Sequence, residues 1–184
     1  MRSNRVMFVV AAVFAADSMF AAFRPPAVPL VSVEPHFSVW SAADQLYDKD
    51  TTHWTGKVQP LMILLDADGV TYRICGRGRG EVLELPVLPQ TECRVGATVT
   101  SYHFADGKGL SAEVDFTTPR LTDDLDVFSR PVTYLTVRVK GAKAASVRAS
   151  GPASRLISRS KAGPRPYRQM ASVKSSARFI CQMA

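Results

Sequence analysis

The residues best suited to chemistry lie in one stretch, PHFSVWSAADQLYDKDTTHWTGK, residues 35–57. His53 with Asp48 or Asp50 could form a general base and the carboxylate that orients it. Ser38 and Ser41 offer hydroxyl groups, but neither lies in the G-x-S-x-G pattern of a nucleophile elbow. The residue types therefore permit acid–base chemistry, while no nucleophile accompanies them.

The same stretch holds potential metal ligands in His36, His53 and Asp48, at spacings that match no known metal-binding loop. The acidic run DDLD, residues 123–126, lacks the alternating oxygen ligands and closing glutamate of a calcium loop. The sequence therefore predicts no metal site, no cofactor and no catalytic residue.

A structural role explains the 35–57 stretch better. Trp40 and Trp54 can each bury a large apolar area, provided that the indole N–H finds a partner. Asp44 and Asp48 are suited to capping a turn through bonds to the backbone. Gly56, in the run TGK, favours a tight turn at positive φ before the next strand.

The elements that must position this stretch are short strands. Alternating residues predict a strand at 37–40, a hairpin of 61–65 and 70–75 around the turn DADG, and a second hairpin around ADGKG. We also expect strands at 82–88 and at 132–140, and a flexible joint at GRGRG, residues 76–80. The mature body contains no long segment of helical periodicity, so the fold class is all-β, an antiparallel β-sandwich.

Charge divides the chain near residue 141. Residues 1–140 carry 14 Lys and Arg against 16 Asp and Glu, whereas residues 141–184 carry nine basic residues and no acid. Because this tail has no sustained apolar periodicity, we expect 142–184 to be a disordered, basic, low-complexity segment. We expect modules at 23–77 and 78–141 before it.

The N-terminus is typical of an export signal. Two arginines precede the apolar run VMFVVAAVFAA, and small residues follow it. The run is shorter than the roughly 20 residues that span a bilayer. We therefore expect residues 1–22 to be a cleaved signal and not a stable membrane anchor. The protein would then be secreted or periplasmic. The cut could follow Ala15, Ala21 or Ala22. In an oxidising compartment Cys75 and Cys93 could form a disulfide, which would leave Cys181 unpaired.

Long motifs then resemble those of one family. PHFSVWSAAD, HWTGK, the TP-L-DDLD pattern at 118–126 and SRPVTYLT are similar to motifs in the N-terminal region of secreted glutaminase A-type proteins, over about residues 24–139. This resemblance implies a β-sandwich followed by a helical toroid that holds most catalytic groups and, in some members, hydrolyses L-glutamine. We expect a truncated form, from a frameshift or an evolved tail, without that helical partner and inactive alone.

Three functions follow from these expectations. The first is a non-catalytic fragment whose loop would face the helical domain; that loop comprises Trp40, Asp44, Asp48, His53, Trp54 and Lys57. The second is a glycan-binding sandwich that uses an exposed tryptophan. The third is a polyanion binder that uses the basic tail, but export argues against a nucleic-acid partner.

Overall fold

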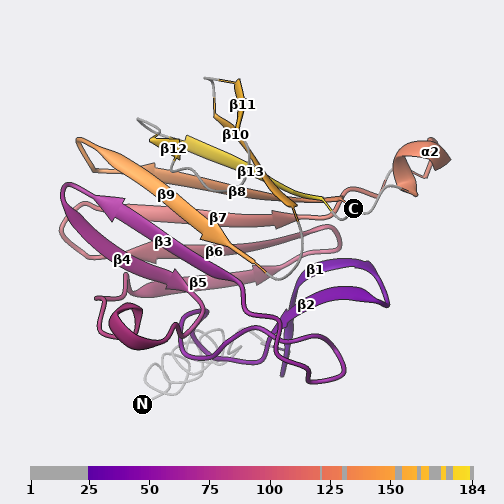
Figure 1. Ribbon diagram of the computed structural model, residues 1–184, viewed down its shortest axis with the longest axis horizontal. Coiled ribbons are helices and arrows are strands. Elements are labelled where there is room, and N and C mark those ends of the chain that lie inside the picture. Colours follow the sequence, from indigo (N-terminus) through magenta and orange to yellow (C-terminus); the bar gives the residue numbers. More distant parts are fainter. Residues whose placement is uncertain are drawn as a thin grey trace, which may run out of the picture.

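Antiparallel strands make up most of the chain in the computed structural model (Figure 1), which describes residues 25–120, 122–129 and 132–151 and, beyond them, the backbone of the strands between 155 and 182. The expected signal, residues 1–22, lies outside these ranges. In chain order the elements are β1 (Val28–Glu34), β2 (Phe37–Ser41), β3 (Met62–Ala67), β4 (Val70–Cys75), the 3-10 helix η2 (Gly80–Val82), β5 (Gln90–Val95), β6 (Val99–Ala105), β7 (Ser111–Thr117), α2 (Leu125–Phe128), β8 (Val132–Lys140), β9 (Ala145–Ser150), β10 (Arg155–Ser160), β11 (Gly163–Arg165), β12 (Ala171–Ser172) and β13 (Ser176–Gln182).

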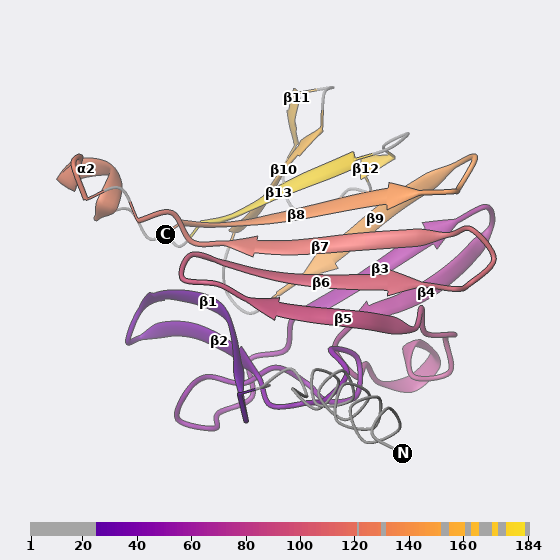
Figure 2. The ribbon, with the colours of Figure 1, turned by 180° about the vertical axis from the view of Figure 1, so that it is seen from behind.

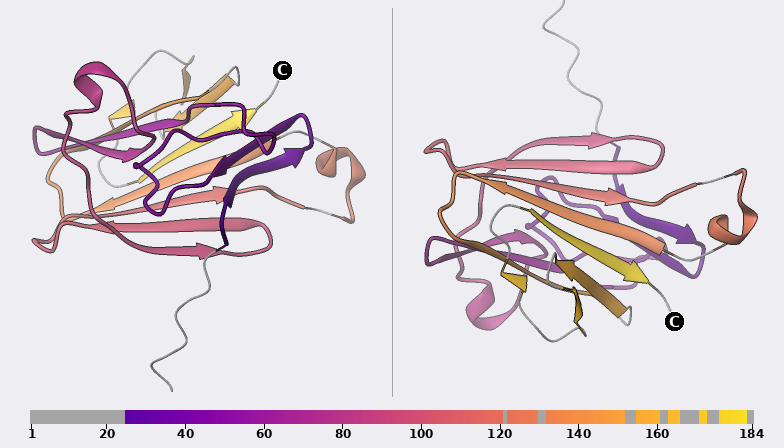
Figure 3. Two further views of the ribbon diagram at one scale, coloured as in Figure 1. Left: turned by 90° about the horizontal axis from the view of Figure 1, so that it is seen from below. Right: turned by 90° about the horizontal axis from the view of Figure 1, so that it is seen from above.

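The strands form two layers. A seven-stranded sheet has the order β11-β10-β13-β8-β7-β6-β5, and a four-stranded sheet has the order β12-β9-β3-β4. Figures 1 and 2 show the smaller sheet lying across one face of the larger one, with the β1–β2 pair beside it. Figure 3 shows α2 projecting away from the layers. The predicted all-β, antiparallel sandwich is confirmed.

Alternation along the strands places the core between the layers. Tyr102 and Phe104 of β6, Val114 and Phe116 of β7, and Leu135 and Val137 of β8 point inward and are buried. From the other layer, β3, β4 and β9 contribute Ile63, Leu65, Ile74 and Val147 to the same core cluster. This single core joins residues on both sides of the module boundary that we expected at 77/78.

Local turn chemistry predicted the hairpins well. In the β3–β4 turn Gly69 has φ 87° and Asp68 has φ 48°. Two consecutive positive φ values allow the strand twist to continue through a two-residue turn, and the Asp-Gly pair tolerates them. Asp68 also accepts the backbone N–H groups of Lys143 and Ala144, at 3.2 and 2.9 Å. The predicted hairpins around DADG and ADGKG are confirmed.

The expected strand at 82–88 is wrong. This segment begins in η2 and continues through turns, and the strand forms instead at Gln90–Val95. Pro86 and Pro89 provide no N–H group for a strand ladder, which explains the shift to β5.

The GRGRG run is also not a free joint. Arg73, which is buried, donates through Nη1 to the backbone oxygens of Tyr47, Gly76 and Arg77. A guanidinium held by three carbonyl groups fastens this loop to the residue 45–48 turn. The expected flexibility at 76–80 is therefore replaced by an anchored loop.

Strand β9 corrects the expectation of a disordered tail. Residues 145–150 pair with β3 along its whole length, Leu65 facing Val147 and Ala67 facing Ala145. Ala145 and Val147 are buried, so a short, weakly patterned strand is stabilised by the partner that covers it. Further along, β13 pairs with β8 and β10 pairs with β13.

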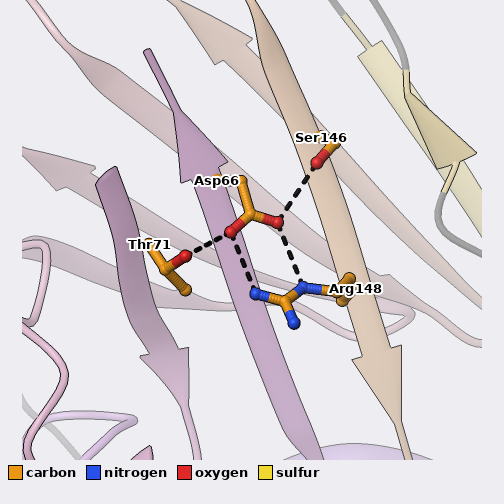
Figure 4. Close-up of polar contacts among 4 residues, drawn as sticks. All are labelled: Asp66, Thr71, Ser146 and Arg148. Atoms are coloured by element: carbon orange, nitrogen blue, oxygen red, sulfur yellow. Dashed lines mark hydrogen bonds and ion pairs between the residues drawn. The ribbon is translucent and has the colours of Figure 1, made fainter. Parts of the chain in front are cut away.

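A polar cluster connects β3, β4 and β9 (Figure 4). Asp66 accepts two bonds from the Arg148 guanidinium, at 2.9 and 3.0 Å, one from Ser146 at 3.2 Å, and one from Thr71. Partial burial opposes the charge of Asp66, yet the hydrogen bonds from Thr71, Arg148 and Ser146 outweigh burial and lower its pKa below the ordinary 3.8. The cluster should therefore stabilise the four-stranded sheet only while Asp66 is ionised.

Replacing Asp66 with asparagine should lower the free energy of unfolding by roughly 1 kcal/mol at pH 7, because the bidentate pair with Arg148 is only half-buried. A carboxyl with a lowered folded-state pKa stabilises the fold above its ordinary pKa, and this stabilisation is lost as the pH falls through the lowered value. The difference between wild type and Asp66→Asn should therefore shrink below about pH 4. Thermal unfolding at pH 7, 5 and 3 measures this, with the exposed Asp123→Asn as control. A pH-independent difference would contradict it.

Candidate functional site

The loop between β2 and β3 contains the predicted site residues, and backbone bonds give it a defined shape. Trp40 at the end of β2 exchanges two hydrogen bonds with Thr52, of 2.7 and 2.9 Å. The His53 N–H donates to the Lys57 carbonyl at 2.7 Å, and the Gly56 N–H donates to the His53 carbonyl at 2.9 Å. Gly56 has φ 85°, so the turn predicted from TGK is confirmed.

His53 has both ring nitrogens engaged. Its Nε2 lies 2.9 Å from the Pro35 carbonyl oxygen, which can only accept, so this nitrogen carries a proton. Nδ1 then accepts from the Thr55 backbone N–H at 3.3 Å and lies 2.8 Å from the Thr55 hydroxyl. The arrangement that the residue types permitted, a His53 base oriented by Asp48 or Asp50, is not formed. In this arrangement His53 ties the loop to the β1–β2 turn.

Trp54 lies beside His53 with its indole exposed. The two ring centroids are 5.4 Å apart, and the Trp54 Nε1 donates to the same Pro35 oxygen at 2.7 Å. The residue is nevertheless 62% exposed. Because the N–H group is already bonded, the exposed surface is mainly the apolar face of the ring.

The other predicted residues of the loop differ in their contacts and in their exposure. Asp48 accepts the Gln45 N–H at 3.2 Å and so caps a turn, as its residue type predicted. Asp44 is exposed, and its backbone oxygen receives the Gln90 amide at 3.4 Å. Lys57 is exposed, whereas Trp40 is half-buried and its indole N–H has no hydrogen-bond partner among the described residues.

Potential metal ligands and cysteines are both present in the described ranges. There, no group of three or more His, Cys, Asp or Glu side chains is placed to hold a metal ion. Cys75 is a buried free thiol that donates to the Leu61 carbonyl, and burial raises its pKa. The Cys75–Cys93 disulfide considered from the sequence is not formed.

Sequence reasoning missed a second group of residues, because it treated GRGRG as a joint. The Arg77 N–H donates to the Asp50 carboxylate at 3.2 Å, so the 76–80 loop and the β2–β3 loop lie together. Asp50, Arg79 and Met62 line a common pocket with the end of β9. The unusual alternation of Gly and Arg was the signal for a shaped loop.

The fold and this site define a class: an antiparallel β-sandwich module with an exposed aromatic loop. Across the described ranges, no helix is long and apolar enough to cross a membrane.

Comparisons with known proteins find two family models that match parts of this chain. Residues 7–86 match the family model described as domain of unknown function DUF4964, and residues 98–148 match the one described as domain of unknown function DUF5127. A 132-residue alignment covering 68% of this chain is 29% identical to Glutaminase A of Aspergillus oryzae. No solved structure matches the chain.

The chain is thus similar to the N-terminal region of glutaminase A-type proteins, as its motifs predicted. It covers 19% of the length of the Aspergillus protein.

Proposed function

We propose that this chain acts as a non-catalytic N-terminal β-sandwich of an exported glutaminase A-like protein, and that its β2–β3 loop is a docking surface for a helical domain. The observation that carries this proposal is Trp54, a 62% exposed indole whose polar atom is already bonded to Pro35. An exposed aromatic ring without an unmet polar group is suited to contact with another protein surface.

The chemistry of the loop supports a docking role over a catalytic one. His53 donates with one nitrogen and accepts with the other, so it has no lone pair directed at solvent for proton abstraction. Instead it holds Trp54 in place through their common acceptor, the Pro35 carbonyl. A rigid, pre-positioned aromatic side chain loses little conformational entropy on association.

The partner follows from the resemblance. Glutaminase A-type proteins are expected to continue into a helical toroid, and the loop combines exposed Trp54 with exposed Asp48 and Lys57. Apolar contact at the centre with charged residues around it is the usual composition of an interface.

Replacing Trp54 with alanine should weaken binding to the helical domain of a glutaminase A-type protein, produced as a separate chain, by at least tenfold. Truncation removes the exposed ring and leaves the backbone bonds of the loop in place. Isothermal titration of wild type and variant measures the change. Val70→Ala, which changes an exposed apolar residue at the start of β4, is the matched control. Equal affinities for wild type and Trp54→Ala would contradict the docking role.

A glycan-binding sandwich is the second candidate, because an exposed indole face is also a platform for a sugar ring. Affinity electrophoresis in a gel containing a soluble β-glucan distinguishes the two functions. Retardation of the wild type that is lost in Trp54→Ala would favour glycan binding, and unchanged mobility would favour docking to protein.

A further inference from the structure

An open pocket of about 410 Å³ lies where three segments meet, and Trp54 is not among its lining residues. These segments are the end of the β2–β3 loop, the GRGRG loop with η2, and the end of β9. The pocket is lined by Asp50, Pro60, Met62, Gly78, Arg79, Val82, Ser150 and Gly151. Its volume lies in the range of small-molecule sites, which combine apolar walls with a few polar groups.

Strand pairing and one glycine bring these segments together. In the β3–β9 ladder Met62 faces Ser150. At Gly78, where φ is 74°, a Cβ atom would lie 2.6 Å from Val82 Cγ1 and 3.3 Å from the end of Met62. The absent side chain therefore allows the loop to lie against the apolar wall formed by Met62 and Val82.

The pocket contains two opposite charges that do not neutralise each other. Asp50 and Arg79 form no ion pair with one another, although both line the cavity. Asp50 accepts one hydrogen bond, from the Arg77 backbone, and the Arg79 side chain makes no hydrogen bond or ion pair to the described residues. An anion alone would meet the Asp50 carboxylate, and a cation alone would meet the Arg79 guanidinium.

We propose that this pocket binds a small zwitterion of the amino-acid class. The ligand's ammonium group pairs with Asp50, its carboxylate pairs with Arg79, and its uncharged chain lies against Met62 and Val82. A guanidinium can bind a carboxylate through two parallel hydrogen bonds, which makes Arg79 well suited to this end of the ligand. The flexible Met62 thioether adapts to chains of different shape.

The test is isothermal titration of the purified chain with L-norleucine, n-hexanoate and n-pentylamine. The second probe lacks the ammonium group of norleucine, and the third lacks its carboxylate. We expect norleucine to bind at least tenfold more tightly than either, because each lost charge removes a charge-assisted hydrogen bond. Absence of norleucine binding at 50 mM, or hexanoate or pentylamine binding as tightly as norleucine, would overturn the proposal.

Variants locate the binding to the pocket. Arg79→Gln and Asp50→Asn should each weaken norleucine binding about tenfold or more, and Arg77→Gln should leave it unchanged. Arg77 is an exposed arginine of the same loop that does not line the pocket, so it is the matched control. Because Arg79 is exposed, its replacement should not disturb folding, and circular dichroism checks both variants. Norleucine binding that survives in Arg79→Gln would place the ligand elsewhere and refute the assignment.

Discussion

Replacing Gly141 with alanine should destabilise the fold by roughly 3–5 kcal/mol, out of the 5–15 kcal/mol typical of a domain. Gly141 follows β8 at φ 85°, where the chain leaves the large sheet for β9. A Cβ atom there would lie 1.9 Å from the Gly109 carbonyl oxygen and 3.1 Å from Leu110 Cα. Because these neighbours are backbone atoms of the β6–β7 hairpin, relief of the clash requires the hairpin or the β8–β9 connection to move.

Gly107→Ala separates the clash from the backbone strain. Gly107 lies in the same hairpin turn at φ 73°, and a Cβ atom there would meet nothing within 4 Å. Its replacement should cost only the left-handed conformation, about 1 kcal/mol. Urea unfolding followed by circular dichroism compares the two variants with wild type. Equal losses of stability would show that Gly141 is held by its φ value alone.

The purified chain should release no ammonia from L-glutamine above the blank, under conditions where Aspergillus oryzae Glutaminase A gives a clear signal. Two candidate reactive groups in the described ranges are occupied or buried. His53 uses both ring nitrogens to hold its loop, and the Cys75 thiol is buried with a raised pKa. The resemblance also implies that most catalytic groups belong to a helical domain.

The variant His53→Ala also tests the expectation that this chain does not hydrolyse L-glutamine. This variant should leave the background rate unchanged while lowering stability, since it removes the bond to Pro35 and the support of Thr55. Turnover by the wild type that disappears in His53→Ala would assign catalysis to the loop and refute the non-catalytic proposal.

Local physics made part of the site predictable. The Asp48 turn and the positive φ of Gly56 follow from residue types whose preferences act over a few positions. The acceptor shared by His53 and Trp54 did not follow, because the Pro35 carbonyl is contributed by the turn before β2. Backbone oxygens are present at every residue, so no sequence pattern marks the one that a side chain will reach.

The sequence by itself determined the strands with clear alternation, such as β6 to β8, and the hairpin turn at Asp68-Gly69. Those depend on side-chain alternation and on φ values that act locally. Only the tertiary structure decided that Ala145–Ser150 becomes a strand beside β3 and that Asp50 and Arg79 line one pocket. Both arise from contacts between segments far apart in the chain. A weakly patterned segment becomes a strand when a partner offers unpaired backbone groups and an apolar surface to cover, and its own residues do not specify that partner.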